Sequence, residues 1–477
     1  MLAKTKAIQL LQTLTAKEVE EFSDHLDLFA SKSAAFLKEI VIWCAGFHPQ
    51  FDQPGFTKEK LLQRLQKRKP VNQDKLRYIL SDLALALEKY VVYKNSLRGD
   101  ARTHLVLLEY YKEKDLERFF NQKFEALEQI LDTSASRGTD FHLIKYQACD
   151  HRYAYHLRKQ REGLDDELQT TSHHLDTYYV IVRLRLFSEM LTREMLLKVT
   201  YDKPLLPAIL EMASWEPYAS DPVVGVYRTV IHMHLEPERE DYFEALQKYI
   251  DSSAPLIPKS ELNDLLVFSQ NYCTGKINQG KENFLWKIWE IYQKMIAYDV
   301  IYEGEYIRPG LLKNIVTVGI RLNQLEAAEK VVDSFGQRVE PRIREGVLGY
   351  NKAVLAFARR DYRQALRLLS QAQVDDIFYE LGTRALFLKL FYELEDAVSF
   401  YHHWDAFYNF IRRNKVMSDA QKASHKNFIR IIRQLMRIRA EGDRNLGMKL
   451  REEIERQGVL DSTWFHKKLD ELKIPRP

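Results

Sequence analysis

The side chains best suited to chemistry in this sequence are its 14 histidines, several of which lie close together. The close sets are His173–His174, His402–His403 and the near pair His232/His234. Adjacent residues on a helix point about 100° apart, and residues two positions apart point about 200° apart. None of these sets therefore aims two rings at one metal ion, and zinc normally needs a further protein ligand. We expect no metal site.

The sequence also lacks the fixed spacings that many enzyme sites require. GxxxxGK[ST], GxGxxG, HExxH and GxSxG are all absent. We therefore predict no catalytic residue and no cofactor, and expect that the protein is not an enzyme. An enzyme site assembled from distant helices stays open, because spacing along the chain cannot exclude it.

A cationic ridge, defined as Lys426, Arg430, Arg433 and Arg437, is the first of two basic features. Spacings of four, three and four place these side chains on one face of a helix whose other side is apolar. Such a face is either simply solvated or contacts an acidic partner, a nucleic-acid backbone or an anionic membrane surface. Residues 411–477 as a whole contain 17 Lys/Arg and 9 Asp/Glu, which favours an acidic partner.

The second basic feature is the segment 57–77, where Lys67 and Arg68 lie at a break between two helices. We group Lys67 and Arg68 with the ridge as candidate contacts for an acidic partner or nucleic acid. The arrangement resembles a helix–turn–helix, but a DNA-reading helix is short. Here the second helix is expected to exceed 20 residues with a continuous apolar face, which is typical of a core helix.

Length and composition limit the class of protein. The chain has 477 residues with 18 Gly and 14 Pro, so helix-breaking residues are scarce and helix is favoured almost throughout. We find no signal peptide at the start and no apolar window near the ~20 residues of a membrane-spanning helix. The three cysteines form no CxxC pair, which fits a reducing compartment. We expect a cytoplasmic protein without a membrane span.

Helix signals position these features. Thr15 and Glu18 form a predicted capping box, and Asn72 is expected to cap a long helix over residues 73–93. Runs of β-branched residues with strand periodicity are almost absent. Trp286, Trp289 and Tyr292, spaced by three, are expected to form a buried stripe.

Small residues recur in the C-terminal half. We expect helices over 346–358 and 362–372, with Ala353 and Ala365 letting the two pack closely. Ala385 and Ala397 repeat the twelve-residue spacing, Ala328 lies 37 residues before Ala365, and "DYFEAL" around Ala245 echoes "DYRQAL" around Ala365. A period in the thirties with one helix pair per unit is typical of an α-solenoid, although any helix bundle uses small residues at crossings.

Residues 311–410 resemble the tetratricopeptide (TPR) repeat family. Positions that match or approximate its preferences are Tyr350, Asn351, Ala353, Asp361, Tyr362, Ala365, Leu366, Leu369 and Ala372. Lys352, Arg360 and Ile377 depart from the usual leucine, turn glycine and closing proline. The chain as a whole also resembles a group of bacterial helical proteins, a resemblance that implies no activity.

The TPR resemblance implies a concave surface formed by the first helix of each pair. In that register Tyr350, Val354 and Phe357 face inward and bind a peptide segment of a partner protein. The alternative is that helices of the same chain cover these residues.

We thus expect an all-α fold, an α–α superhelix of TPR-like helix pairs with an N-terminal helical module. The predicted segments are the module (1–98), the repeat array (99–415) and basic C-terminal helices capping the array (416–477). The favoured function is a non-enzymatic scaffold or adaptor that binds a protein or peptide through the concave surface. The alternative is a nucleic-acid-binding protein that uses the basic helices at 57–77 and 422–439.

Overall fold

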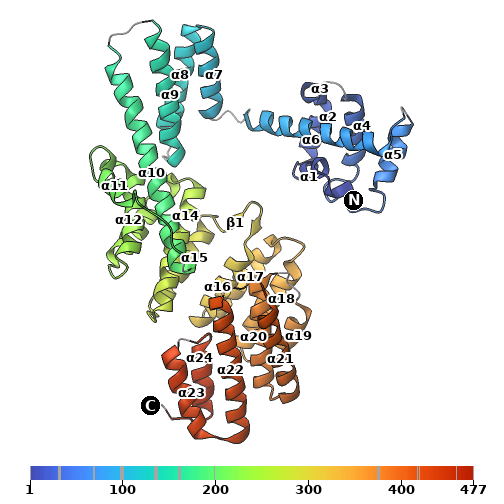
Figure 1. Ribbon diagram of the computed structural model, residues 1–477, viewed down its shortest axis with the longest axis vertical. Helices are drawn as coiled ribbons and strands as arrows, with labels where there is room; N and C mark the ends of the chain where they lie inside the picture. The colour runs from blue at the N-terminus through green and yellow to red at the C-terminus, as the bar shows by residue number, and fades with distance from the viewer. Residues whose placement is uncertain are drawn as a thin grey trace. The chain divides into compact units, whose positions relative to one another are not determined.

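The fold is known from a computed structural model, which describes residues 2–30, 34–67, 70–96, 101–133, 138–159, 163–197, 199–372, 376–415, 417, 419–457 and 459–475. Helices account for nearly all regular structure in this part of the chain (Figure 1). The predicted all-α class is therefore confirmed. Backbone contacts divide the chain into two compact units, Met1–Val182 and Arg183–Pro477. The segment boundaries expected after residues 98 and 415 stay predictions.

Within its described residues the first unit contains nine complete α-helices, and α10 continues from it into the second unit. Its elements are η1 (Leu2–Lys4), α1 (Lys6–Gln12), α2 (Ala16–Asp24), α3 (Leu26–Phe29), α4 (Ala34–Ala45), α5 (Lys58–Gln66), α6 (Gln73–Ser96), α7 (Ala101–Glu113), α8 (Glu117–Thr133), α9 (Thr139–Leu157) and α10 (Asp165–Leu197).

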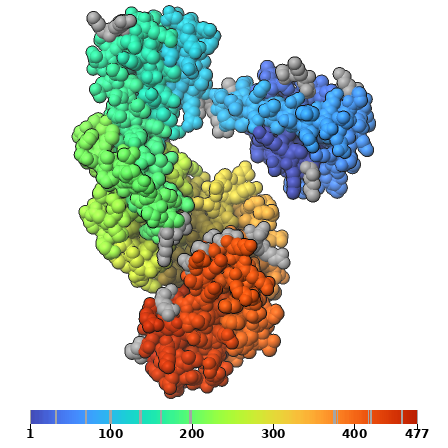
Figure 2. Space-filling model, in the orientation of Figure 1, coloured from blue at the N-terminus to red at the C-terminus, as the bar shows by residue number. Residues whose placement is uncertain are grey.

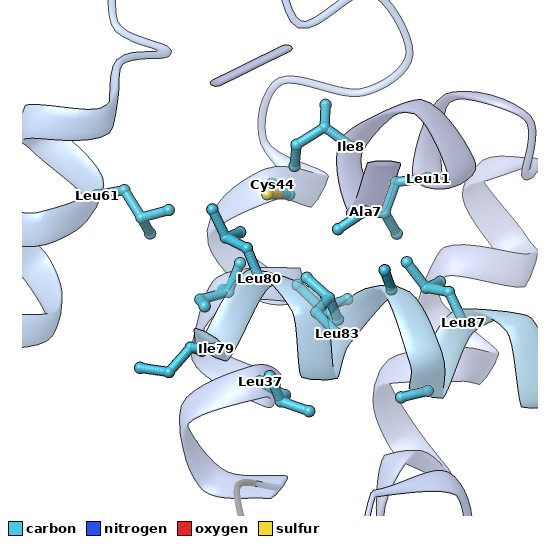
Figure 3. Close-up of a cluster of buried hydrophobic side chains, with 14 of the residues drawn as sticks. Ala7, Ile8, Leu11, Leu37, Cys44, Leu61, Ile79, Leu80, Leu83 and Leu87 are labelled. Atoms are coloured by element: carbon cyan, nitrogen blue, oxygen red, sulfur yellow. The ribbon is translucent and has the colours of Figure 1, made fainter. Parts of the chain in front are cut away.

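Local sequence signals explain several of these helices. Thr15 and Glu18 form the predicted capping box, in which each side chain bonds the other's backbone N–H. Asn72 accepts a hydrogen bond from the Lys75 backbone N–H at 2.9 Å, as expected for the cap of α6. The buried face of α6 packs on α1, α3 and α4. Figure 3 shows Leu80 and Leu83 of this face among the buried side chains of the cluster. The N-terminal helices therefore enclose a core of their own.

The second unit carries the remaining helices and a two-stranded antiparallel pair. Its further elements are α11 (Leu206–Met212), η2 (Tyr218–Ser220), α12 (Pro222–Leu235), α13 (Asp241–Ser253), η3 (Ala254–Leu256), α14 (Lys259–Asn278), α15 (Phe284–Ala297), β1 (Tyr302–Glu303), β2 (Tyr306–Ile307), α16 (Pro309–Arg321), α17 (Leu325–Phe335), η4 (Gly336–Arg338), α18 (Arg344–Ala358), α19 (Tyr362–Gln371), α20 (Ile377–Glu393), α21 (Ala397–Arg413), α22 (Asp419–Glu441), α23 (Arg444–Gln457) and α24 (Ser462–Glu471).

In three consecutive helix pairs, the same type of turn connects the first helix to the second. Asn323, Arg360 and Glu395 each adopt a left-handed backbone conformation, with φ of 56°, 64° and 60°. In each turn the next residue's N–H bonds a carbonyl five positions back, as Asp361 does to the Ala356 oxygen at 3.0 Å. This is the Schellman closure of a helix C-terminus, here with a non-glycine residue in the position that glycine usually occupies. The pairs α16–α17, α18–α19 and α20–α21 thus share one turn geometry.

Small residues lie at the contact between the two helices in two of these pairs. Ala353 and Ala365 are fully buried where α18 packs on α19, as expected from the sequence. Ala328 is likewise fully buried against α16. Close approach of helix backbones requires small side chains on at least one side of the contact.

The proposed correspondence with Ala385 and Ala397 is wrong. Ala385 is only half-buried and Ala397 is exposed at the start of α21. The shared turns lie 35 residues apart at Arg360 and Glu395, so the buried positions of the α20–α21 pair fall elsewhere in the sequence. Leu388 and Phe400, both fully buried, occupy them.

The echo around Ala245 also fails, because Ala245 is exposed. Asp241 is the first residue of α13 and pairs with Arg239 at 2.7 Å, whereas Asp361 caps α19 by accepting the Gln364 N–H. The similar letters are therefore offset by one residue relative to the helix start. The aromatic stripe on α15 is only partly right: Trp289 and Tyr292 are buried, but Trp286 is 50% exposed.

The first helices of successive pairs also contact one another. α16 packs on α18, α18 on α20, and α20 on α22. The C-terminal helices α22–α24 share one apolar core with α20 and α21. In the space-filling view of Figure 2 the orange and red parts of the chain adjoin each other. Within the described residues, no helix combines the length and apolarity needed to cross a lipid bilayer.

Candidate partner-binding surface

The predicted partner-binding residues lie on one side of α18, which faces α16 and α20. Tyr350 is buried, with its ring packed edge-on against Tyr379 of α20 at 5.0 Å between centroids. Lys313 of α16 places its ammonium nitrogen 5.2 Å and 5.3 Å from the two ring centroids, within cation–π range. Three consecutive first helices therefore meet at Tyr350.

Gly382 lets α20 approach this cluster. A Cβ at Gly382 would lie 2.4 Å from the Tyr350 hydroxyl oxygen and 3.0 Å from the Lys313 nitrogen. Any larger residue would displace the tyrosine or the lysine. The two polar atoms consequently rest against the backbone of α20.

Asn351 ties the same three helices together by hydrogen bonds. Its side-chain nitrogen donates to the Val347 carbonyl at 2.8 Å and to the Tyr379 hydroxyl at 3.2 Å. Tyr379 then donates to the Pro309 carbonyl at 2.8 Å. The TPR resemblance included Asn351. Its bridging role gave no signal in the sequence, because its partners lie on helices that are 28 or more residues away.

Burial changes the acid–base behaviour of this cluster. It lowers the pKa of Lys313 to about 8 and raises the pKa of the Tyr350 and Tyr379 phenols above their usual range. Both tyrosines are therefore neutral near pH 7, while Lys313 is mostly protonated.

Val354 and Phe357 continue the same side of α18 toward its C-terminus, and both are half-buried. The Phe357 ring contacts Tyr362 of α19 at 5.4 Å and lies 5.2 Å from the Lys389 nitrogen. Lys389 pairs with Asp461 at 3.0 Å, just before α24. Helices of the same chain thus cover the predicted face in part: Tyr350 is enclosed, while Val354 and Phe357 retain accessible surface.

The cationic ridge lies on α22 as predicted, but carboxylates of the same chain neutralise half of it. Arg430 forms a two-pronged ion pair with Glu453 of α23, and Arg437 pairs with Glu441 at 2.8 Å. Arg433 instead stacks on Trp404, and Lys426 is exposed. Two of the four predicted cations are thereby available to a partner.

The second basic feature belongs to the other unit. Lys67 is exposed directly after α5, and Arg68 lies outside the described residues. A cavity of about 470 Å³ opens nearby between α1, α5 and α6, with Ala7 and Leu80 on its apolar floor. Its rim combines the cations Lys6, Lys58 and Arg77 with the carboxylates Glu59 and Asp74. Because the charges nearly balance, this region gives little support to phosphate binding.

A cluster of histidines on α9 and α10 was missed in the sequence. His142 is buried, and its Nδ1 lies 3.1 Å from Nδ1 of His174, which directly follows His173 in the sequence. Burial, with His142 and His173 nearby, lowers the pKa of His174 to about 4. Among the described residues, no three His, Cys, Asp or Glu side chains are arranged to hold a metal ion.

The three cysteines, Cys44, Cys149 and Cys273, are buried and unbonded. Burial raises the pKa of the Cys44 thiol to about 12, which makes it a poor nucleophile.

Comparison with known proteins adds no assignment. No protein-family model, curated protein or solved structure matches this chain.

Proposed function

We propose that this protein is a non-enzymatic scaffold that binds a protein or peptide partner through the first-helix side of its C-terminal helix pairs. The observation that carries the proposal is the packing of α16, α18 and α20 against one another, each in a pair closed by the same Schellman turn. Helix pairs stacked through their first helices favour a curved array with those helices on the concave side.

The accessible part of the proposed binding surface is Val354 and Phe357, with Lys389 beside them. Because Asp461 already pairs with Lys389, the patch suits a peptide that carries an apolar anchor. Tyr350 supports the surface from beneath because its ring is enclosed by Lys313, Tyr379 and Gly382.

Site-specific photo-crosslinking in the full-length chain tests this proposal. A photoreactive phenylalanine analogue at Val354 is expected to capture one discrete protein. An excess of the chain without the analogue is expected to reduce this capture by competition. Lys352 is the matched control, because it lies about 200° around the same helix and pairs with Asp333 of α17. Equal labelling from both positions, or none from Val354, contradicts the proposal.

Nucleic-acid binding is the second candidate, and the exposed cations Lys426 and Arg433 of α22 favour it. Contact with several phosphates would weaken binding by about tenfold or more between 50 and 200 mM salt. Titration with single- and double-stranded oligonucleotides at those two salt concentrations measures this. The ion pairs of Arg430 and Arg437 reduce the charge on which this candidate depends.

A further inference from the structure

The exposed side of α21 carries apolar side chains in a helical row. Val398, Tyr401 and Tyr408 are 84%, 44% and 39% exposed. Their spacing of three and seven residues keeps them on one face of the helix. The opposite face, formed by Phe400, Phe407 and Ile411, is fully buried. The row is thus a surface feature and not the edge of the core.

Trp404 joins this row to the ridge on α22, which packs beside α21 (Figure 1). Its indole N–H donates to the Ile429 carbonyl at 3.0 Å, which fixes the ring. The Tyr408 ring lies parallel to it, with 5.8 Å between centroids. The Arg433 guanidinium lies 4.4 Å from the Trp404 centroid, on an interhelical cation–π contact. The stacked rings of Trp404 and Tyr408 therefore form one aromatic platform, which connects the apolar row to the Arg433 cation.

Positive charge predominates around the platform. Lys426, Arg433 and Arg412 are exposed, and none of them forms an ion pair with another described residue. The carboxylate on the row itself is Asp405, which accepts a hydrogen bond from the Asn409 side chain at 3.1 Å. The three unpaired cations therefore outnumber the exposed carboxylates Asp405 and Asp419, the latter on the same face of α22 as Lys426 and Arg433.

We propose that an aromatic–cationic surface, defined as Val398, Tyr401, Trp404, Tyr408, Lys426 and Arg433, binds an acidic amphipathic helix of a partner protein. The exposed apolar row matches the apolar stripe of such a helix, and the flanking cations match its Glu and Asp residues. Because the surface lies on α21 and α22, it is distinct from the face of α18 and its test is independent of that proposal.

A protein helix suits this surface better than nucleic acid does. Val398, the most exposed member of the row, gains nothing from a phosphate backbone but is buried favourably by an apolar side chain. The ion pairs of Arg430 and Arg437 remove two of the cations that a phosphate track would need.

Fluorescence anisotropy on the full-length protein tests the proposal with a defined probe. The probe is a labelled synthetic helix of about four turns, with Leu along one face and Glu on its flanks. We expect saturable binding that weakens about tenfold or more in Arg433→Glu and in Tyr408→Ala. Arg363→Glu is the matched control, since it makes the same charge change at an exposed position of α19 and is expected to bind like the wild type.

Circular dichroism of each variant checks that it is folded. Absence of saturable binding to the wild type would overturn the proposal, as would equal weakening by Arg433→Glu and Arg363→Glu. A single-stranded oligonucleotide that binds more tightly than the acidic helix and displaces it would also overturn it, in favour of nucleic-acid recognition. A helix in which Lys replaces Glu is expected not to bind.

Discussion

Gly319 of α16 faces Ala328 of α17 so closely that a Cβ at Gly319 would lie 2.9 Å from the Ala328 Cβ. Trp289 of α15 closes the same space, 3.2 Å from that position. The first helix of this pair is therefore in contact on two sides, and neither neighbour is the end of a flexible chain.

We predict that Gly319→Ala destabilises the protein, by about 1–3 kcal/mol, because the added methyl group overpacks this contact. Urea denaturation of the full-length chain measures the change. The control is Gly225→Ala in α12, where no atom lies within 4 Å of the added Cβ. There alanine is expected to be neutral or to stabilise the helix by up to about 1 kcal/mol. Equal effects at both glycines would argue against the close contact.

The left-handed turn residue Arg360 gives a second prediction. Its φ of 64° is costly for a residue with a Cβ, so Arg360→Gly is expected to be more stable than Arg360→Ala by about 0.5–1 kcal/mol. Both variants remove the same guanidinium, so their difference in unfolding free energy isolates the backbone. If alanine is as stable as glycine, the turn does not have the conformation described.

Lys313 predicts a pH dependence at alkaline pH. Its pKa is lowered by burial from its ordinary value of 10.5 to about 8 in the folded protein. Between these values the unfolded chain binds more protons, so stability rises with pH across that window. Lys313→Met removes this contribution, and its melting curve is expected to shift less than that of the wild type between about pH 7 and about pH 10. An identical pH dependence would show that Lys313 titrates normally.

His234 predicts a dependence at acidic pH. Thr192 donates its hydroxyl proton to the Ser188 carbonyl, so it accepts the Nε2–H of His234 at 2.9 Å. Burial lowers the pKa of His234 to about 4 from 6.5, and the unfolded chain binds more protons between these values. Stability is therefore lost as the pH falls from about 6.5 to 4.

His234→Gln is expected to reduce that acid sensitivity, as measured by urea denaturation at several pH values in this range. NMR titration of the ring protons gives the pKa directly. A His234 ring that titrates near 6.5 in the folded protein would contradict the predicted burial effect.

Local signals in the sequence predicted much of the fold. The cap at Thr15, the long helix after Asn72 and the α18–α19 pair all depend on residues within about one helical turn or one tight turn of each other. Such interactions are encoded by spacing alone. The buried alanines Ala353 and Ala365 followed from the same short-range pattern.

Alignment of repeats failed where helix lengths change. A spacing of 32 residues suggested Ala397 as the equivalent of Ala365, whereas the turns are 35 residues apart and Phe400 takes the buried position. The predicted burial of Trp286 was wrong for a geometric reason. Three residues spaced by three advance about 120° around a helix, so one end of such a row leaves the buried face.

The candidate site depends on neighbours that are distant in sequence. Nothing near Arg430 indicates that Glu453, 23 residues away on α23, neutralises it. The enclosure of Tyr350 likewise requires Lys313 and Tyr379, which come from two other helices. Side-chain partners of this kind follow from tertiary packing and have no signature in local periodicity.

The central claim is tested most directly by a binding measurement. The protein captured by cross-linking at Val354 is titrated against the full-length chain, and its affinity is measured. We predict saturable binding that weakens about tenfold or more in Val354→Asp, because a carboxylate would be buried against an apolar partner group. Lys352→Asp on the other side of α18 is expected to bind like the wild type. Unchanged affinity in Val354→Asp, with the variant folded, would contradict a binding role for this face.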